Sequence, residues 1–287
     1  MSKFRIVTDS SCDLPQNKVE EFGLSVVQLD VLVEGRPTKA DCDVDPKDFY
    51  AGLRDGLAAS TSAANVDKFT NVFEDIVNGG EDVLYIGFSS GLSATYQAST
   101  IAAEDVMAAH PGCKVITVDS LCASLGQGLL VYHAVMQAKA GKSIEEVAKF
   151  VEDNRLKLCH WFTVDDLHFL KRGGRISAAT AVVGSMLSIK PILHVDDEGH
   201  LINVSKTRGR RKSVEELFHM MEEKAIKPAD QVVYISHGDC IEDAEYLASL
   251  IREKWGCKEI LINYVGPVIG AHSGPGTLAL FFLGKKR

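Results

Sequence analysis

The sequence predicts an α/β protein with two α/β domains, at residues 1–157 and 158–287. In the first part of the chain, short apolar strand-like runs alternate with helix-like segments, a pattern typical of right-handed crossovers in a mostly parallel sheet. From about residue 157 strands joined by short turns appear, which predicts a mixed sheet with helices. The length of 287 residues is sufficient for two modest domains.

The first domain is expected to hold the mostly parallel sheet with flanking helices. Apolar residues at helical spacing indicate the helices, most clearly over residues 66–77. Ligands of such sheets bind at the carboxyl ends of the strands, and here those ends are rich in hydroxyl groups, as in residues 87–93. The expected strands are residues 4–8, 24–33, 83–88 and 115–118, and the expected helices are residues 15–22, 46–57, 66–77, 92–109 and 125–140.

The second domain is expected to hold the mixed sheet. Residues 191–196 and 201–206 predict a hairpin around a short Asp-Glu-Gly turn. Residues 176–189 predict a helix that is apolar nearly all round and therefore buried, either as a central core helix or as a wall beside an apolar ligand. The other expected strands are residues 158–164, 231–236, 258–264 and 277–283, and the other expected helices are residues 213–225 and 242–254.

Composition narrows the classes of function. The net charge of −8 argues against a general nucleic-acid binder. The chain shows no signal peptide and no apolar stretch of about 18 residues, so we expect no membrane span. Seven cysteines without a C-x-x-C pair are expected to be free thiols in a reducing cytoplasm. Basic clusters at residues 171–175 and 208–212 are either solvated loops or contacts for an anion or a partner.

Residues 87–91 match G-x-S-x-G, the nucleophile elbow of α/β-hydrolases. A serine hydrolase would use Ser89 as nucleophile, with Asp119 and His272 following in the chain. However, further hydroxyl groups follow at positions 90, 93 and 95, and a single catalytic serine needs no such cluster. The alternative is that hydroxyl groups near helix N-termini hold an anion without attacking it.

We expect no metal site. The acidic run at residues 41–45 resembles the start of a calcium loop, but Gly52 stands at the twelfth position, where a bidentate glutamate is required. The nine histidines show no ligand spacing. His272 lies among glycines and prolines, and is a turn residue, a donor to a bound anion or a catalytic base.

Taken together, these segments resemble the DegV family over essentially the whole chain. Proteins of that family have two α/β domains with a fatty acid buried in the cleft between them. In many Gram-positive bacteria they are the fatty-acid-binding subunit of fatty acid kinase, and they present the carboxylate to a separate ATP-binding subunit that makes the acyl-phosphate. The matching segments are IVTDSSCDLP (6–15), TSAAN (61–65), SSGLSATYQAS (89–99), VDS (118–120), FLKRGGRIS (169–177), IKPIL (189–193), KTRGRRK (206–212) and HSGPG (272–276).

The resemblance implies a lipid-binding protein that is not a catalyst on its own and has no cofactor. It implies that Thr61, Ser62 and Ser93 hold the carboxylate with His272 beside it, and that Arg172 acts either there or on the kinase partner. Apolar residues of the expected helix and strands supply the tunnel walls, and the basic loop contacts the partner. The tunnel residues are Ala181, Val182, Ser185, Ile189 and Phe281, and the partner-binding residues are Lys206, Arg208 and Arg210.

The implied partners are a long-chain fatty acid and the kinase subunit, without nucleic acid and with at most transient contact to a membrane surface. One position departs from the family. The family pattern T-S-x-P-S has a proline and a serine where this chain has Ala64 and Asn65. Asn65 still suits a helix cap, whereas the rigidity of the proline is lost. The hydroxyl groups of Thr61 and Ser62 are retained, so carboxylate binding remains the expectation.

Overall fold

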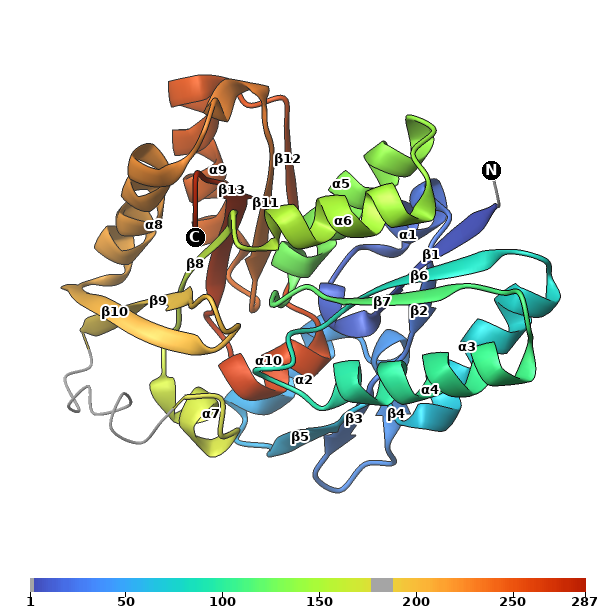
Figure 1. The fold of residues 1–287 in the computed structure, drawn as a ribbon. Helices are drawn as coiled ribbons and strands as arrows, with labels where there is room; N and C mark the ends of the chain where they lie inside the picture. Colours follow the sequence, from blue (N-terminus) through green and yellow to red (C-terminus); the bar gives the residue numbers. More distant parts are fainter. Residues whose placement is uncertain (1–2, 177–187) are drawn as a thin grey trace.

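The fold was analysed in a computed structural model that describes residues 3–176 and 188–287 (Figure 1). A four-stranded parallel sheet has the order β2-β1-β6-β7. Helices α3 and α4 pack on one face, and α5 and α6 on the other. The predicted mostly parallel sheet with flanking helices is confirmed. Its elements are β1 (Phe4–Asp9), α1 (Gln16–Phe22), β2 (Ser25–Val27), α3 (Val66–Asn78), β6 (Asp82–Gly87), α4 (Thr95–Ala109), β7 (Val115–Asp119), α5 (Leu125–Lys139) and α6 (Ile144–Arg155).

A small antiparallel sheet of order β4-β3-β5 follows the first two strands. The expected single strand at 24–33 is therefore wrong, because its two halves are β2 and β3 in different sheets. Thr61 and Ser62 lie at the end of β5 and not in a loop, since that segment pairs with β3. The elements are β3 (Asp30–Val33), β4 (Lys39–Ala40), α2 (Pro46–Arg54) and β5 (Ala59–Ser62).

The third sheet is mixed, as predicted, with the order β10-β9-β8-β13-β11-β12. Only β11 and β12 run parallel among these paired strands, and β9 and β10 form the predicted hairpin. Helices α8 and α9 cover one face, and α5 packs against the other. The elements are β8 (Leu158–Thr163), β9 (Ile189–Val195), β10 (Leu201–Arg208), α8 (Arg210–Lys224), β11 (Val232–His237), α9 (Ile241–Trp255), β12 (Glu259–Tyr264) and β13 (Leu278–Leu283).

Helix α5 lies between the two large sheets, and one hydrophobic cluster joins them through it (Figure 1). This helix is buried on nearly every face, as a helix without a polar stripe must be. The predicted domain boundary at residue 157 falls in the turn between α6 and β8, and it remains a prediction.

Two short helices were not predicted, α7 (Leu167–Arg172) and α10 (Pro267–Ser273). Helix α10 comes from the second half of the chain but packs against α2, β3 and β5 of the first half, and also against α7 (Figure 1). The N-terminus of α10 is hydrogen-bonded to a side chain that is remote in the sequence. Asp41 Oδ1 accepts a hydrogen bond of 3.1 Å from Val268 N–H. A Gly/Pro-rich segment is thereby held as a helix.

The expected apolar helix at 176–189 falls mostly outside the described residues, and with it Ala181, Val182 and Ser185. Ile189 is the first residue of β9, so a helix extending to that position is wrong. Within residues 3–176 and 188–287, no helix is long and apolar enough to cross a membrane. All seven cysteines lie in the described part of the chain, and each is a free thiol.

Candidate ligand-binding site

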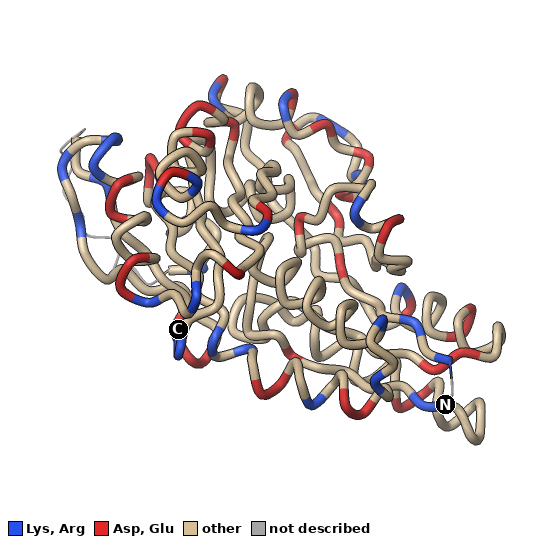
Figure 2. Tube along the Cα trace, turned by 90° about the horizontal axis from the view of Figure 1, so that it is seen from above, with Lys and Arg blue, Asp and Glu red and all other residues tan. Residues whose placement is uncertain are grey.

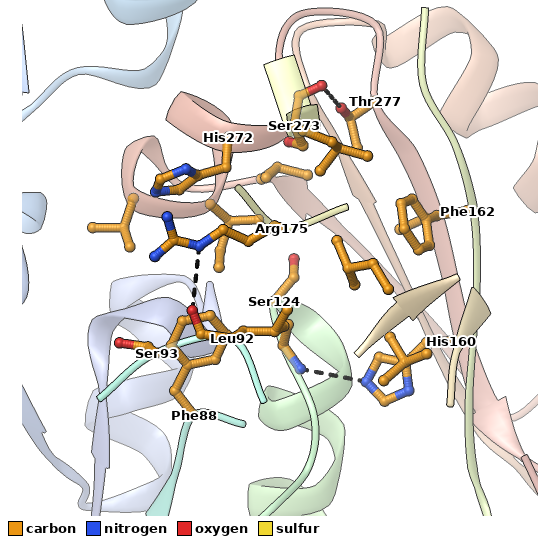
Figure 3. Close-up of a pocket in the computed structure, with 18 of the residues that line it drawn as sticks. Phe88, Leu92, Ser93, Ser124, His160, Phe162, Arg175, His272, Ser273 and Thr277 are labelled. Carbon is orange, nitrogen blue, oxygen red and sulfur yellow. Dashed lines mark hydrogen bonds between the residues drawn. The ribbon is translucent and has the colours of Figure 1, made fainter. Parts of the chain in front are cut away.

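A cavity of about 290 Å³ lies between the two halves of the chain (Figure 3). Strands, loops and α10 all contribute to its wall, which brings together residues from almost the whole sequence. Most of the lining is apolar, and a few polar side chains interrupt it. The apolar lining residues are Leu29, Ala63, Phe88, Leu92, Ala94, Ala123, Phe162, Leu170, Val195, Leu201, Val265, Val268, Ile269, Ala279 and Phe281.

Thr61 and His272 meet at one end of this cavity. Thr61 Oγ1 lies 2.7 Å from His272 Nε2, within hydrogen-bond distance. Side chains alternate along β5, so Thr61 faces inward while Ser62 is exposed and does not belong to the lining. Ser62 Oγ reaches only the carbonyl oxygen of Ala63, at 3.4 Å. The structure thus brings His272 and one of the two predicted β5 hydroxyl groups together.

Ser93 also lines the cavity, in the loop between β6 and α4. Its Oγ lies 2.9 Å from Thr95 Oγ1 and accepts a hydrogen bond of 3.2 Å from Thr95 N–H. Helix α4 begins at Thr95, three residues later than predicted. Ser93 is therefore held at the start of a helix, where free N–H groups and the helix dipole favour an anion.

The electrostatics around His272 keep its imidazole neutral. Burial, together with the positive charges of Arg175 and Arg172, lowers the pKa of His272 to about 4. Gly173 approaches the ring so closely that a Cβ atom there would lie 2.3 Å from His272 Nδ1. A neutral imidazole can either donate or accept a hydrogen bond at Nε2, depending on its tautomer.

The arginine that lines the cavity is Arg175 and not Arg172. Arg175 Nε donates to the carbonyl oxygen of Leu92 at 3.2 Å, and burial lowers the pKa of its guanidinium. Figure 3 shows Arg175 beside His272 and Leu92. Arg172 is exposed and lies over the Phe169 ring, 4.9 Å from its centroid. Arg175 lies in the basic cluster predicted at residues 171–175, but Arg172 was singled out because nothing in the sequence of that cluster distinguishes the two arginines.

The structure does not assemble the serine hydrolase triad. Ser89 is fully buried, and its Oγ donates to the carbonyl oxygen of Gly199 at 2.9 Å. Asp119 Oδ1 accepts from Leu121 N–H at 3.0 Å and binds no histidine among the described contacts. Because Nε2 of His272 pairs with Thr61, the nucleophile and its base are not in contact. Ser89 instead joins the β6 loop to the β9–β10 turn.

The remaining predicted residues occupy different surroundings. Phe281 belongs to the cavity wall, whereas Ile189 does not. Lys206 and Arg208 are exposed on β10, the edge strand of its sheet. Arg210 is half-buried and donates to Asp243 Oδ2 at 2.8 Å, so its charge is already paired.

The two positions that depart from the family pattern are both accommodated. Ala64 is buried in the core of the first half. Asn65 is the N-cap of α3, and its Oδ1 accepts from Lys68 N–H at 3.0 Å. The expected cap is confirmed. Within the described ranges, no three histidine, cysteine or acidic side chains are grouped so that they could hold a metal ion.

Six polar residues of the lining were not singled out from the sequence. They come from the segment after α7, the N-cap of α5, β8, β11, α10 and the segment before β13, so no local pattern connects them. Figure 3 shows His160 and Phe162 across the cavity from Ser93 and His272. These missed residues are Ser124, His160, Arg175, Ser236, Ser273 and Thr277.

Comparison with known proteins gives a consistent result. Residues 3–285 match the model of the family described as "Uncharacterised protein, DegV family COG1307". A DegV domain-containing protein of Clostridium perfringens is 48% identical over 99% of this chain and 98% of its own. A DegV domain-containing protein of Lactococcus lactis is 36% identical over 99% and 98%, respectively.

Solved structures agree with the same assignment. A fatty-acid-binding DegV family protein from Thermus thermophilus has a TM-score of 0.89 and 31% identity, over 98% of this chain and 99% of its own. DegV of Bacillus subtilis, a fatty acid binding protein, has a TM-score of 0.87 and 29% identity, over 99% and 100%. The match in sequence extends over nearly the full length and the match in fold is equally complete. This chain belongs to the DegV family.

Proposed function

We propose that this chain binds a long-chain fatty acid, with the acyl chain inside the cavity and the carboxylate at Thr61, Ser93 and His272. The observation that carries the proposal is an apolar cavity with hydroxyl groups, a neutral imidazole and Arg175 gathered at one end. The fatty acid binding of the Thermus thermophilus and Bacillus subtilis relatives supports it.

The energetics suit such a ligand. Burying an acyl chain is worth about 0.8 kcal/mol per methylene group, so a dozen methylenes contribute about 10 kcal/mol before ordering costs. A carboxylate is expensive to bury alone, and it needs donors that replace its water. Thr61 and Ser93 carry hydroxyl donors, and Arg175 supplies a positive charge close to His272.

In this proposal the chain has no catalysis and no cofactor of its own, and it presents the bound carboxylate to an ATP-binding kinase subunit in the cytoplasm. Exposed Lys206 and Arg208 on the edge strand, together with exposed Arg172, are the residues proposed to contact that partner. Elsewhere Lys and Arg are interspersed with Asp and Glu over both halves of the molecule (Figure 2). The paired Arg210 is left out of the contact for the reason given above.

The test of fatty acid binding is mass spectrometry of the protein purified gently from bacteria and then denatured. We expect a released fatty acid. Empty protein that also fails to bind a labelled fatty acid contradicts the proposal. A fluorophosphonate probe tests the hydrolase alternative, and we expect no labelling of Ser89 because its Oγ is buried and bonded to Gly199.

The kinase partnership needs its own test. Loaded protein is mixed with an ATP-binding fatty acid kinase subunit and ATP, and acyl-phosphate is measured. We expect Lys206→Glu with Arg208→Glu to lower the rate while the affinity for fatty acid stays unchanged. The control is Lys149→Glu, an exposed lysine on α6, in the other half of the chain. Equal rates for all three proteins contradict the assignment of this surface.

A further inference from the structure

Three polar side chains stand in the cavity wall besides those proposed to hold the carboxylate. They are nearly fully buried: Ser236 is 0% exposed, His160 1% and Ser124 5%. All three line the cavity, and Figure 3 shows His160 across it from His272 and Ser93. The binding of a plain acyl chain gives these groups no role, because methylene groups offer them no hydrogen bond.

His160 presents a lone pair at Nε2. Its Nδ1 lies 3.0 Å from the carbonyl oxygen of Leu158 and must carry the proton to bond with it. Burial and the nearby charge of Arg287 hold the pKa of His160 well below its usual value, so the ring is neutral and Nε2 is an acceptor. The donor that faces Nε2 is Ala123 N–H, at a long 3.5 Å. The single lone pair of Nε2 therefore faces the backbone at the start of α5.

The fold makes room for this imidazole. A Cβ atom on Gly126, in the first turn of α5, would lie 2.1 Å from His160 Nε2. The ring edge can therefore occupy this position only because residue 126 is glycine. The other ring neighbour is Phe281, edge-on at 5.3 Å between centroids.

Ser236 presents a second acceptor. Ser124 Oγ donates to Asp13 Oδ2 and lies 3.0 Å from Ser236 Oγ. Either of these two hydroxyl groups can be the donor, and in both arrangements Ser236 Oγ keeps at least one free lone pair. Ser124 is held there in a strained backbone conformation, with φ 54° and ψ −150°. Such strain in a residue other than glycine persists only where the surroundings impose it, and it concentrates at functional sites.

We propose that this wall binds a hydroxyl group on the acyl chain, so that the ligand class includes fatty acids hydroxylated along the chain. The inference rests on the proposed fatty acid binding. The ligand O–H donates to Ser236 Oγ, and the remaining wall stays apolar. A buried hydroxyl group without a partner weakens binding, whereas one that meets an unused acceptor keeps its hydrogen bond.

The test compares one saturated fatty acid with its monohydroxylated forms, in which the hydroxyl group is moved carbon by carbon along the chain. The readout is the affinity of each hydroxylated form relative to the parent acid. We expect one position, or a few adjacent ones, to bind at least as tightly as the parent, and the others to bind about tenfold more weakly. A uniform penalty at every position overturns the inference.

Substitutions in the cavity wall test whether these side chains cause the preference for one position of the ligand hydroxyl group. Ser236→Ala is expected to lower the relative affinity of the favoured hydroxylated acid about tenfold. Leu201→Ala is the control, because it removes apolar lining and should weaken parent and hydroxylated acids by the same factor. An unchanged preference in Ser236→Ala overturns the inference, while absence of binding by any fatty acid overturns the proposed function as well.

Discussion

Thr61 Oγ1 and His272 Nε2 lie 2.7 Å apart, although 211 positions separate the two residues in the chain. One side chain comes from β5 in the small sheet and the other from α10 near the end of the sequence. The polar end of the cavity therefore exists only in the closed fold, and the residues around this contact are the most direct targets for experiment.

The proposed carboxylate donors can be removed with little change of shape. Thr61→Val combined with Ser93→Ala deletes two hydroxyl groups and leaves the apolar lining in place. We expect the affinity for a fatty acid to fall between about tenfold and a hundredfold, because each lost hydrogen bond to a charged group is worth about 1.5–3 kcal/mol and water compensates in part. Titration with a fluorescent fatty acid measures the loss.

The matched control for these variants is Ser62→Ala. Ser62 is adjacent to Thr61 but exposed and outside the lining, so its hydroxyl group should not matter for affinity. Equal losses for Thr61→Val and Ser62→Ala would place the carboxylate elsewhere.

Gly173 controls the position of His272. A methyl group in Gly173→Ala would lie 2.3 Å from His272 Nδ1, so the imidazole or the loop must move. We expect the pair with Thr61 to open and fatty acid affinity to fall about tenfold. Gly79→Ala is the control, since Gly79 also ends a helix, with φ −74° against −72° for Gly173, but lies away from the cavity lining. The prediction fails if both variants bind alike.

Asp41 makes stability depend on pH below neutrality. Burial raises the pKa of Asp41 to about 7 from its ordinary value of 3.8. The folded state binds the proton of Asp41 more tightly than the unfolded state does. The stabilisation from this protonated carboxyl is therefore complete below the pKa of the unfolded state, and it is lost as the pH rises to about 7. Through this carboxyl, the free energy of unfolding should fall by roughly 1.4 kcal/mol for each pH unit between about 4 and about 7, and it should change little above that.

Asp41→Asn isolates this effect, because its Oδ1 can still accept from Val268 N–H. Urea unfolding of both proteins between about pH 5 and pH 8 is the measurement. His272 and His133, whose pKa values are lowered to about 4 with burial as the largest cause, contribute equally to both proteins and cancel in the comparison. We expect the stability of Asp41→Asn relative to the unsubstituted protein to rise from about pH 5 to about pH 7 and to level off above that. Parallel pH profiles for the two proteins would contradict the assignment.

The buried side chain of Arg287 links three segments of backbone through hydrogen bonds. Its guanidinium donates to the carbonyl oxygens of Arg155 and Asp196 at 2.7 Å each and of Leu158 at 3.3 Å. Arg287→Ala leaves these buried acceptors short of a donor, and we expect it to cost about 3 kcal/mol of unfolding free energy. The adjacent Lys286→Ala, at an exposed position, should change stability by less than about 0.5 kcal/mol. Similar denaturation midpoints for the two variants would contradict this role.

Periodic patterns in the sequence predict most elements well, because the period of apolar residues reports the local backbone directly. The helix expected at 66–77 is α3 (Val66–Asn78), and the hairpin expected at 191–206 is β9 and β10. Alternation along 24–33 indicates extended chain but carries no information on pairing, so it could not show that β2 and β3 join different sheets. Helix α10 was missed since its N-terminus is held by Asp41, which is remote in the sequence.

Residue patterns along the chain indicate the fold class, the family and the chemical types at the site, hydroxyl groups with a late histidine. Which of those groups face the cavity depends on how the elements pack together. Thr61 points inward and Ser62 outward, Arg175 lines the wall while Arg172 does not, and Ser89 is bonded to Gly199. The physical reason is that side-chain direction follows from strand pairing and from packing between distant segments, and neither is encoded in local spacing.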